Sequence, residues 1–180
     1  LRRTGAPPSR RGSARRAIVR IKLPDGASGV YLFTARRGPF AATVPLTMDD
    51  GASHRVLVVL PAMTWQGRNP VDDDGDGRPN LLGDGLPVRL ARVFGTPEVP
   101  GFGQREAPTL AWLDRARHRY DLTTDVALAA GVGPKLAGHA GGLFSGDAGW
   151  LPAKGLPSVV TGAWAVMAPN TSPRASQSWL

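Results

Sequence analysis

The sequence contains no cysteine and no apolar stretch near the roughly 18 residues that a transmembrane helix needs. The missing cysteine excludes disulfides, thiolate metal sites and cysteine nucleophiles, but it leaves the cellular compartment open. No secretory signal is visible. Because the sequence begins at Leu1 rather than at a methionine, we expect a piece of a larger protein, whose remainder or a partner subunit it contacts.

Acidic residues are absent from residues 1–20, which hold seven arginines of a chain whose net charge is +8. Residues 21–180 are nearly balanced, with 15 basic and 14 acidic side chains. An arginine-rich arm can bind phosphates or an anionic membrane surface. Residues 1–16 carry no interleaved aromatic side chain and no nucleic-acid motif, so we expect a disordered, solvated arm, with nucleic-acid binding as the alternative.

Familiar catalytic spacings are absent as well. No HxxH or HExxH pair is formed by the three histidines, which are His54, His118 and His139. Ser145 does not fit a nucleophile elbow, because the G-x-S-x-G glycine positions hold Leu143 and Asp147. We therefore interpret His139 as structural or solvent-facing, with a general-base or metal-ligand role as the alternative.

Glycine and proline supply 40 of the 180 residues and predict many turns. A small β-meander within residues 17–50 is predicted by three β-rich runs, at residues 17–23, 30–35 and 40–46. Residues 55–60 are continuously apolar and β-branched, as expected of a strand buried on both faces. The proline- and glycine-rich residues 61–108 are predicted to form a long loop.

Helices and strands are predicted to alternate after this loop. The predicted elements are a helix at residues 107–118, a strand at 120–124, a helix at 125–130, a strand at 136–145 and a helix opening at Trp150. This order predicts an α/β domain with a parallel sheet over residues 51–156. The first helix presents an apolar stripe of Leu110, Leu113 and Ala116. Residues 157–180 show no period and are interpreted as an irregular, non-native tail.

An aspartate-rich segment, Asp72-Asp-Asp74-Gly-Asp76-Gly77, matches the D-x-D-x-D-G start of a calcium loop. Calcium requires several hard oxygen ligands around one point, and alternate aspartates with a glycine turn can supply them. Asn80 stands at the ninth loop position, and Asp84 lies one residue beyond the twelfth, which is a glycine. The run Asp74–Asn80 resembles the calcium turns of thrombospondin type 3 repeats more than an EF-hand. The alternative is a simple acidic turn without an ion.

Polar side chains follow the apolar strand at Thr64-Trp65-Gln66. The carboxyl ends of parallel strands are the usual place for function in α/β proteins, so Thr64 and Gln66 are candidate site residues. The alternative is that Trp65 packs beneath the loop while its two neighbours bind backbone groups.

Three segments resemble the C-terminal domain of the N,N-dimethylformamidase large subunit. The most specific is Val56-Leu-Val-Val-Leu-Pro-Ala-Met-Thr-Trp-Gln-Gly-Arg-Asn69, which is similar to the family's V-L-P-x-N-T-W-Q-A-Y-N. The supporting segments are Ser28-Gly-Val-Tyr-Leu32 and the run from Leu110 through Tyr120-Asp-Leu-Thr-Thr-Asp125 to His139. Their order and spacing are those of the family over residues 28–152.

The resemblance implies a three-layer, glutamine-amidotransferase-like (flavodoxin-like) parallel sheet with Thr64–Gln66 beside the active site. In catalytic relatives, an iron ion held by tyrosines and a glutamate hydrolyses a small amide. Tyr120 matches a family tyrosine. Arg68 stands where the family has another tyrosine, and Ala140-Gly141 stands where it has Asp-Glu, so the implied set of iron ligands is incomplete here.

We expect a catalytically reduced amidotransferase-like domain that binds a ligand or partner and carries a Ca²⁺-ordered loop at residues 72–84. A metal-dependent hydrolase of a small amide is the second interpretation, and nucleic-acid binding through the arm is the third. Candidates for a catalytic role are Thr64, Gln66, Tyr120 and His139. Candidates for metal ligands are Asp72, Asp74, Asp76, Asn80 and Asp84.

Overall fold

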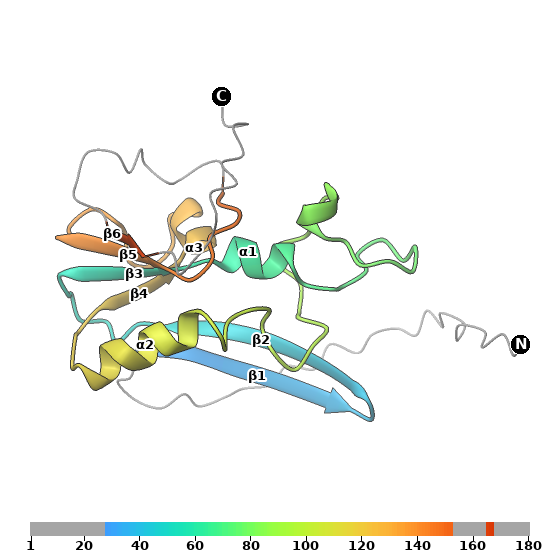
Figure 1. Cartoon of the computed structure of the whole chain (residues 1–180), viewed down its shortest axis with the longest axis horizontal. Helices are drawn as coiled ribbons and strands as arrows, with labels where there is room; N and C mark the ends of the chain where they lie inside the picture. The colour runs from blue at the N-terminus through green and yellow to red at the C-terminus, as the bar shows by residue number, and fades with distance from the viewer. Residues whose placement is uncertain (1–27, 153–164, 168–180) are drawn as a thin grey trace, which may run out of the picture.

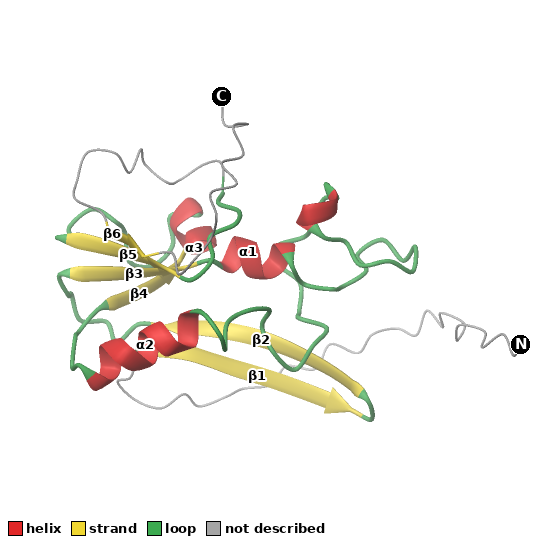
Figure 2. Cartoon of the chain, viewed as in Figure 1, coloured by secondary structure: helices red, strands yellow, loops and turns green. Residues whose placement is uncertain are grey.

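The computed structural model of the chain describes residues 28–152 and 165–167 (Figure 1). The arm predicted at residues 1–16, the strand predicted at residues 17–23 and most of residues 157–180 lie outside the described residues. The described chain folds as mixed α/β, with one antiparallel hairpin and one parallel sheet (Figure 2).

The hairpin consists of β1 (Gly29–Arg37) and β2 (Phe40–Met48), paired in register from Gly29 opposite Met48 to Arg37 opposite Phe40. Gly38 makes the turn with a φ of +58°, a conformation that glycine adopts without steric cost. The two strands predicted at residues 30–35 and 40–46 are confirmed and are longer than expected. The third strand of the predicted meander falls on residues that are not described.

The parallel sheet has the strand order β4-β3-β5-β6. Its strands are β3 (Val56–Leu60), β4 (Asp121–Thr124), β5 (Gly141–Ser145) and β6 (Ala165–Met167). Strand β3 lies between β4 and β5, and its residues 57–60 are at most 1% exposed. The prediction of a strand buried on both faces at residues 55–60 is therefore confirmed for residues 57–60, whereas Arg55 and Val56 are exposed.

Apolar side chains cover both faces of this sheet. Val58 and Leu60 pack in one cluster with Leu110 and Leu113 of α2 (Glu106–Arg115). Leu57, Val59 and Phe144 pack in a second cluster with Leu128 of α3 (Asp125–Ala129). Figure 1 shows α2 and the hairpin on one side of the sheet and α3 on the other. The alternation of side chains along β3 thus builds one core per face.

The helix predicted at residues 107–118 is confirmed, but it ends three residues early, at Arg115. Leu110 and Leu113 are buried as predicted, whereas Ala116 is exposed because it follows the last helical residue. The chain then turns through Arg117, which has a φ of +57°.

The long loop predicted at residues 61–108 is wrong in part, because it contains α1 (Ala62–Gly67) and a short 3-10 helix, η1 (Leu82–Asp84). The buried carboxylate of Asp125 accepts a hydrogen bond from the Met63 backbone N–H at 3.1 Å, in the first turn of α1. The group that stabilises the start of α1 therefore lies 62 residues away in the sequence. No local pattern could reveal it.

Two predicted elements in the last third of the chain differ from the structure. The strand predicted at residues 136–145 begins only at Gly141, and residues 136–140 form a loop whose Leu136 joins the core. Residues 150–152 are not helical. Residues 165–167, within the region expected to be irregular, pair in parallel with β5.

The hairpin is joined to the α/β part by backbone hydrogen bonds. Thr43 of β2 and Phe94 exchange two of them, at 2.9 and 2.8 Å. Phe94 is 1% exposed and packs in the same cluster as α2. None of the helices in the described chain is long and apolar enough to cross a membrane.

Candidate functional site

Helix α1 places the candidates Thr64 and Gln66 at the carboxyl edge of the parallel sheet, the edge at which β3, β4 and β5 end. Both side chains are buried, with 1% and 8% exposure. They were predicted on a loop and instead lie on a helix, because α1 begins directly after β3. Their position at this edge agrees with the expectation for an α/β protein.

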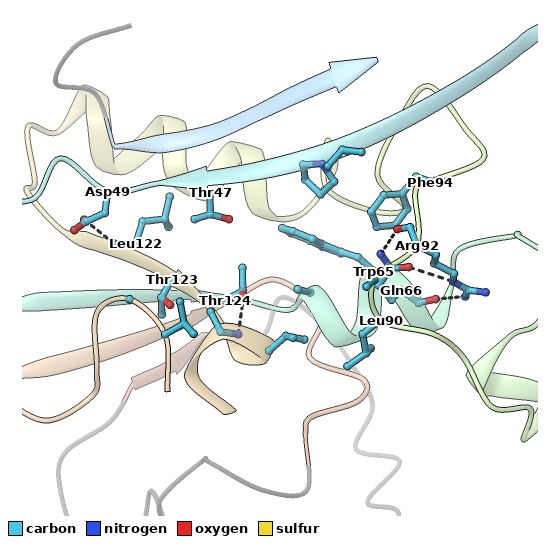
Figure 3. Close-up of a pocket in the computed structure, with 18 of the residues that line it drawn as sticks. Thr47, Asp49, Trp65, Gln66, Leu90, Arg92, Phe94, Leu122, Thr123 and Thr124 are labelled. Carbon is cyan, nitrogen blue, oxygen red and sulfur yellow. Dashed lines mark hydrogen bonds between the residues drawn. The ribbon is translucent and has the colours of Figure 1, made fainter. Parts of the chain in front are cut away.

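A pocket of about 570 Å³ opens beside α1, between β2 and the ends of β4 and α3 (Figure 3). Its walls are mostly apolar, and a few polar side chains line it. The polar and charged lining residues are Thr47, Asp49, Gln66, Arg92, Thr123 and Thr124. Pockets of this size and character are typical of small-molecule sites, which lie preferentially at such sheet edges.

Gln66 is held in one orientation by its neighbours. Its side-chain N–H donates to the Arg92 carbonyl at 2.9 Å, and its side-chain oxygen accepts from the Asn69 amide at 3.0 Å and from Arg92 Nε at 3.2 Å. Figure 3 shows Gln66 and Arg92 side by side in the pocket wall. Because both the nitrogen and the oxygen of the amide have partners, the Gln66 side chain is already fixed in the pocket wall before a ligand binds.

Arg92 makes hydrogen bonds to several chain segments, a role that the sequence did not reveal. Its guanidinium donates to the backbone carbonyls of Gln66, Asn69, Val71 and Asn80, and it forms an ion pair with Asp73 at 2.8 Å. Arg92 thereby ties the aspartate-rich loop to the pocket wall. An arginine in a stretch predicted to be a loop carries no local signal of such a role.

Thr64 faces away from this pocket network and binds the chain after β5. Its hydroxyl accepts from the Trp150 N–H at 3.1 Å and donates to the Trp150 carbonyl at 3.2 Å. The guanidinium of Arg68 lies 5.8 Å from the centre of the Trp150 ring, within range of a cation–π contact.

Two arginines converge on Asp147, which follows β5. Arg68, just after α1, and Arg105, just before α2, both donate to Asp147 Oδ2. Burial opposes ionisation of Asp147, but the hydrogen bonds from the two guanidiniums outweigh it and hold its pKa below the usual range. Both arginine side chains are more than a third exposed, at 34% and 38%.

Glu106 lies buried beside this cluster and is 1% exposed. Burial raises its pKa to about 7, although the Trp65 indole N–H, which donates to it at 3.3 Å, opposes the rise. Any side chain at Gly146 would overlap the Glu106 carboxyl group. Gly146 also has a φ of +85°, so both space and backbone conformation require glycine there.

The other two catalytic candidates lie at the opposite, amino edge of the sheet. Tyr120 precedes β4, and His139 precedes β5. Tyr120 donates to Asp114 at 3.0 Å, and burial together with that carboxylate raises its pKa above the usual value. The four candidates therefore do not form one constellation, since the sheet separates Thr64 and Gln66 from Tyr120 and His139.

A histidine–aspartate–histidine cluster occupies the amino edge. The Asp121 carboxylate accepts hydrogen bonds from His54 Nδ1 at 2.6 Å, from His139 Nε2 at 2.8 Å and from the His54 backbone N–H at 3.0 Å. The side chain of His139 is 7% exposed and contacts Asp121, so the expectation that it faces solvent is wrong. Burial opposes ionisation of Asp121, but the hydrogen bonds from His139 and His54 outweigh it and lower its pKa.

The aspartate-rich loop brings the first three predicted ligands together. Asp72, Asp74 and Asp76 offer oxygens that lie within 4.8 Å of one another, so this exposed group could bind a metal ion. Asp72 also accepts backbone hydrogen bonds from Gly75 at 2.6 Å and Gly77 at 2.9 Å, which lower its pKa.

The remaining two predicted ligands take other places. Asn80 donates to Asp74 at 3.3 Å, but its side-chain oxygen already accepts the Asp73 backbone N–H at 2.5 Å. Asp84 ends η1 and is not part of the three-carboxylate group. The loop therefore supplies three carboxylates directly, and an ion bound there would need further oxygens from water or the backbone.

The described residues do not fit the iron site that the resemblance implies. Arg68 stands where the resemblance would require a tyrosine and binds Asp147, while Ala140 and Gly141 have no oxygen-bearing side chain. Tyr120 donates to Asp114 at the other edge of the sheet. A cationic side chain in place of an anionic ligand disfavours a metal cation there.

No family model, curated protein or solved structure matches the chain.

Proposed function

We propose that the chain is an amidotransferase-like α/β domain that binds a small, mainly apolar ligand and carries a Ca²⁺-ordered loop, without iron-dependent catalysis. The pocket of about 570 Å³ at the carboxyl edge of the sheet carries this proposal. The position of the pocket supports it, because ligands of α/β proteins bind outside the carboxyl ends of the strands.

The chemistry of the pocket supports a neutral ligand with one polar group. Apolar side chains such as Val44, Leu90 and Val126 provide most of the contact surface. Thr123 and Thr124 add hydroxyl groups, and the fixed amide of Gln66 limits how a ligand can be oriented. Small amides combine an apolar body with one carbonyl, so they are the first probes to test.

The ligand proposal can be tested by saturation-transfer NMR with N,N-dimethylbenzamide. Saturable binding to the wild-type chain is expected. Ala127→Phe, which fills the pocket from α3, abolishes the signal, whereas Ala130→Phe, on an exposed residue outside the lining, leaves it unchanged. Equal binding to both variants, or no saturable binding to the wild type, contradicts the proposal. Hydrolysis of the amide with bound iron would instead establish the hydrolase alternative.

The Ca²⁺ proposal rests on the converging oxygens of Asp72, Asp74 and Asp76. Three carboxylates repel one another unless a cation lies between them, so Ca²⁺ should stabilise the native loop. Adding Ca²⁺ to protein prepared in chelator is expected to raise the melting temperature of the wild type. Asp74→Ala should remove the response, and Asp84→Ala, outside the three-carboxylate group, should keep it. A wild-type response that Mg²⁺ or added NaCl reproduces would contradict a calcium site.

A further inference from the structure

We propose that Arg68 and Arg105 form a binding site for a carboxylate-bearing small molecule, and that the Asp147 carboxylate occupies this site when no ligand is bound. The proposal is independent of the apolar pocket, which neither arginine lines. It rests on the geometry of three side chains that come from three separate elements at the carboxyl edge of the sheet.

The two guanidiniums have more hydrogen-bonding capacity than Asp147 uses. Arg68 Nη2 and Arg105 Nη1 both donate to the same atom, Asp147 Oδ2. Each guanidinium has five N–H donors in a planar fork that matches a carboxylate. Asp147 uses one N–H of each guanidinium, so the pair keeps further donors at a partly exposed position, and Glu106 offsets only part of the second positive charge.

Trp150 and Thr64 pack beside Arg68, and Ser145 lies two residues before Asp147 in the chain. The Trp150 ring covers Arg68, and Thr64 holds the Trp150 backbone by two hydrogen bonds. Ser145, at the end of β5, is 2% exposed, and its hydroxyl has no hydrogen-bond partner among the described residues. Side chains alternate along a strand, so Ser145 shares the sheet face of Leu143, which packs against the α2 cluster.

The neighbouring Glu106 favours a singly charged ligand over a doubly charged one. Its carboxyl group ionises near neutrality and interacts electrostatically with Arg105. An ionised Glu106 beside the pair repels a phosphate dianion more strongly than a carboxylate. Asp147 itself is a carboxylate, so the site already accommodates this group.

Asp147 lies in a short glycine-containing segment and competes directly with a ligand for the two arginines. The segment Gly146-Asp147-Ala148-Gly149 has two glycines, and a Cβ at Gly149 would only touch its neighbours at ordinary contact distances. A ligand carboxylate must compete with Asp147, whose effective concentration at the arginines is on the order of millimolar or higher. Removal of the Asp147 carboxylate should therefore strengthen the binding of a free carboxylate by at least about tenfold.

The test is calorimetric titration and thermal unfolding of the full chain with sodium acetate, compared with sodium chloride at equal ionic strength. Asp147→Ala is expected to have a lower melting temperature than the wild type. Acetate, but not chloride, should restore most of this difference in melting temperature. Acetate should bind Asp147→Ala at least about tenfold more tightly than it binds the wild type. Asp147→Asn, which has nearly the same size, replaces Asp147→Ala if the latter does not fold.

Further variants separate the site from a simple surface ion pair. Arg68→Gln combined with Asp147→Ala should abolish the acetate effect, and Arg115→Gln, on an exposed arginine at the end of α2, should preserve it. The proposal is overturned if acetate and chloride stabilise Asp147→Ala equally. It is also overturned if acetate still stabilises the variant that combines Arg68→Gln with Asp147→Ala. Tighter binding of inorganic phosphate than of acetate overturns the assignment of the ligand as a carboxylate.

Discussion

The cluster at the amino edge of the sheet predicts a large loss of stability when Asp121 is replaced by alanine. This carboxylate joins three segments, because it binds His54 before β3 and His139 before β5 while it opens β4 itself. Its side chain is 6% exposed, and both histidine side chains are at most 11% exposed. The bonds are therefore largely protected from competing water.

The magnitude follows from the hydrogen bonds that disappear. Asp121→Ala removes the bonds to His54 Nδ1, His139 Nε2 and the His54 backbone N–H. Hydrogen bonds to a charged group contribute about 1.5–3 kcal/mol each, and breaking a buried charged cluster typically costs about 3–5 kcal/mol. We expect a decrease of about 4 kcal/mol in the free energy of unfolding, a large part of the roughly 5–15 kcal/mol of a typical domain.

The assay is urea unfolding, followed by fluorescence and by circular dichroism at neutral pH. Glu98→Ala, on an exposed side chain, is the control and should change the free energy of unfolding by less than about 0.5 kcal/mol. The native pKa of Asp121 is lowered, so its stabilisation is present above the unfolded-state pKa near 4 and is lost as pH falls toward the native pKa. The difference between wild type and variant should therefore shrink in acid. A loss below about 1 kcal/mol at neutral pH would refute the reasoning.

Three further predictions concern the carboxyl edge. Gly146→Ala should lower the free energy of unfolding in urea by about 1–3 kcal/mol or more. The added methyl group would be strained by the positive φ and would overlap the Glu106 carboxyl group. A smaller effect would mean that Glu106 moves freely. The pKa of Glu106 is raised to about 7, so the native state binds the extra proton and wild-type stability should fall as pH rises from about 4.5 to 7. Glu106→Gln should show a smaller fall, because only the contribution of Asp125, whose pKa burial raises to about 6, remains, and parallel pH profiles of wild type and variant would contradict the assignment. Arg92→Met should loosen residues 69–80 and increase their amide hydrogen exchange, since four backbone carbonyls lose a donor, while exchange in β1 and β2 stays unchanged.

Much of the fold could be predicted from local patterns. The buried strand at Val56–Leu60, the hairpin strands and the helices at Glu106–Arg115 and Asp125–Ala129 were all anticipated within a few residues. Hydrophobic pattern predicts the buried strand and the ten-residue helix, because each one buries apolar side chains against the core. The helix at Ala62–Gly67 was missed, since the proline- and glycine-rich stretch that contains it indicates a loop and its stabilising carboxylate comes from Asp125.

The candidate sites divide in the same way. Sequence spacing predicted the group of Asp72, Asp74 and Asp76, because ligands in one short loop are necessarily close. Spacing could not show that His139 lies beside Asp121, which is 18 residues away, or that Asp147 lies beside Arg68, which is 79 residues away. Such pairs depend on which strands are neighbours in the sheet.

The sequence by itself determined the mixed α/β class, the central buried strand and the aspartate loop, because hydrophobic pattern and turn chemistry act over a few residues. Only the tertiary structure decided which polar groups share an environment. The parallel pairing of β3 with β4 and β5 brings three chain segments together at each edge of the sheet. It thereby places Asp121 between two histidines at one edge and Asp147 between two arginines at the other, where burial and neighbouring charge set their ionisation.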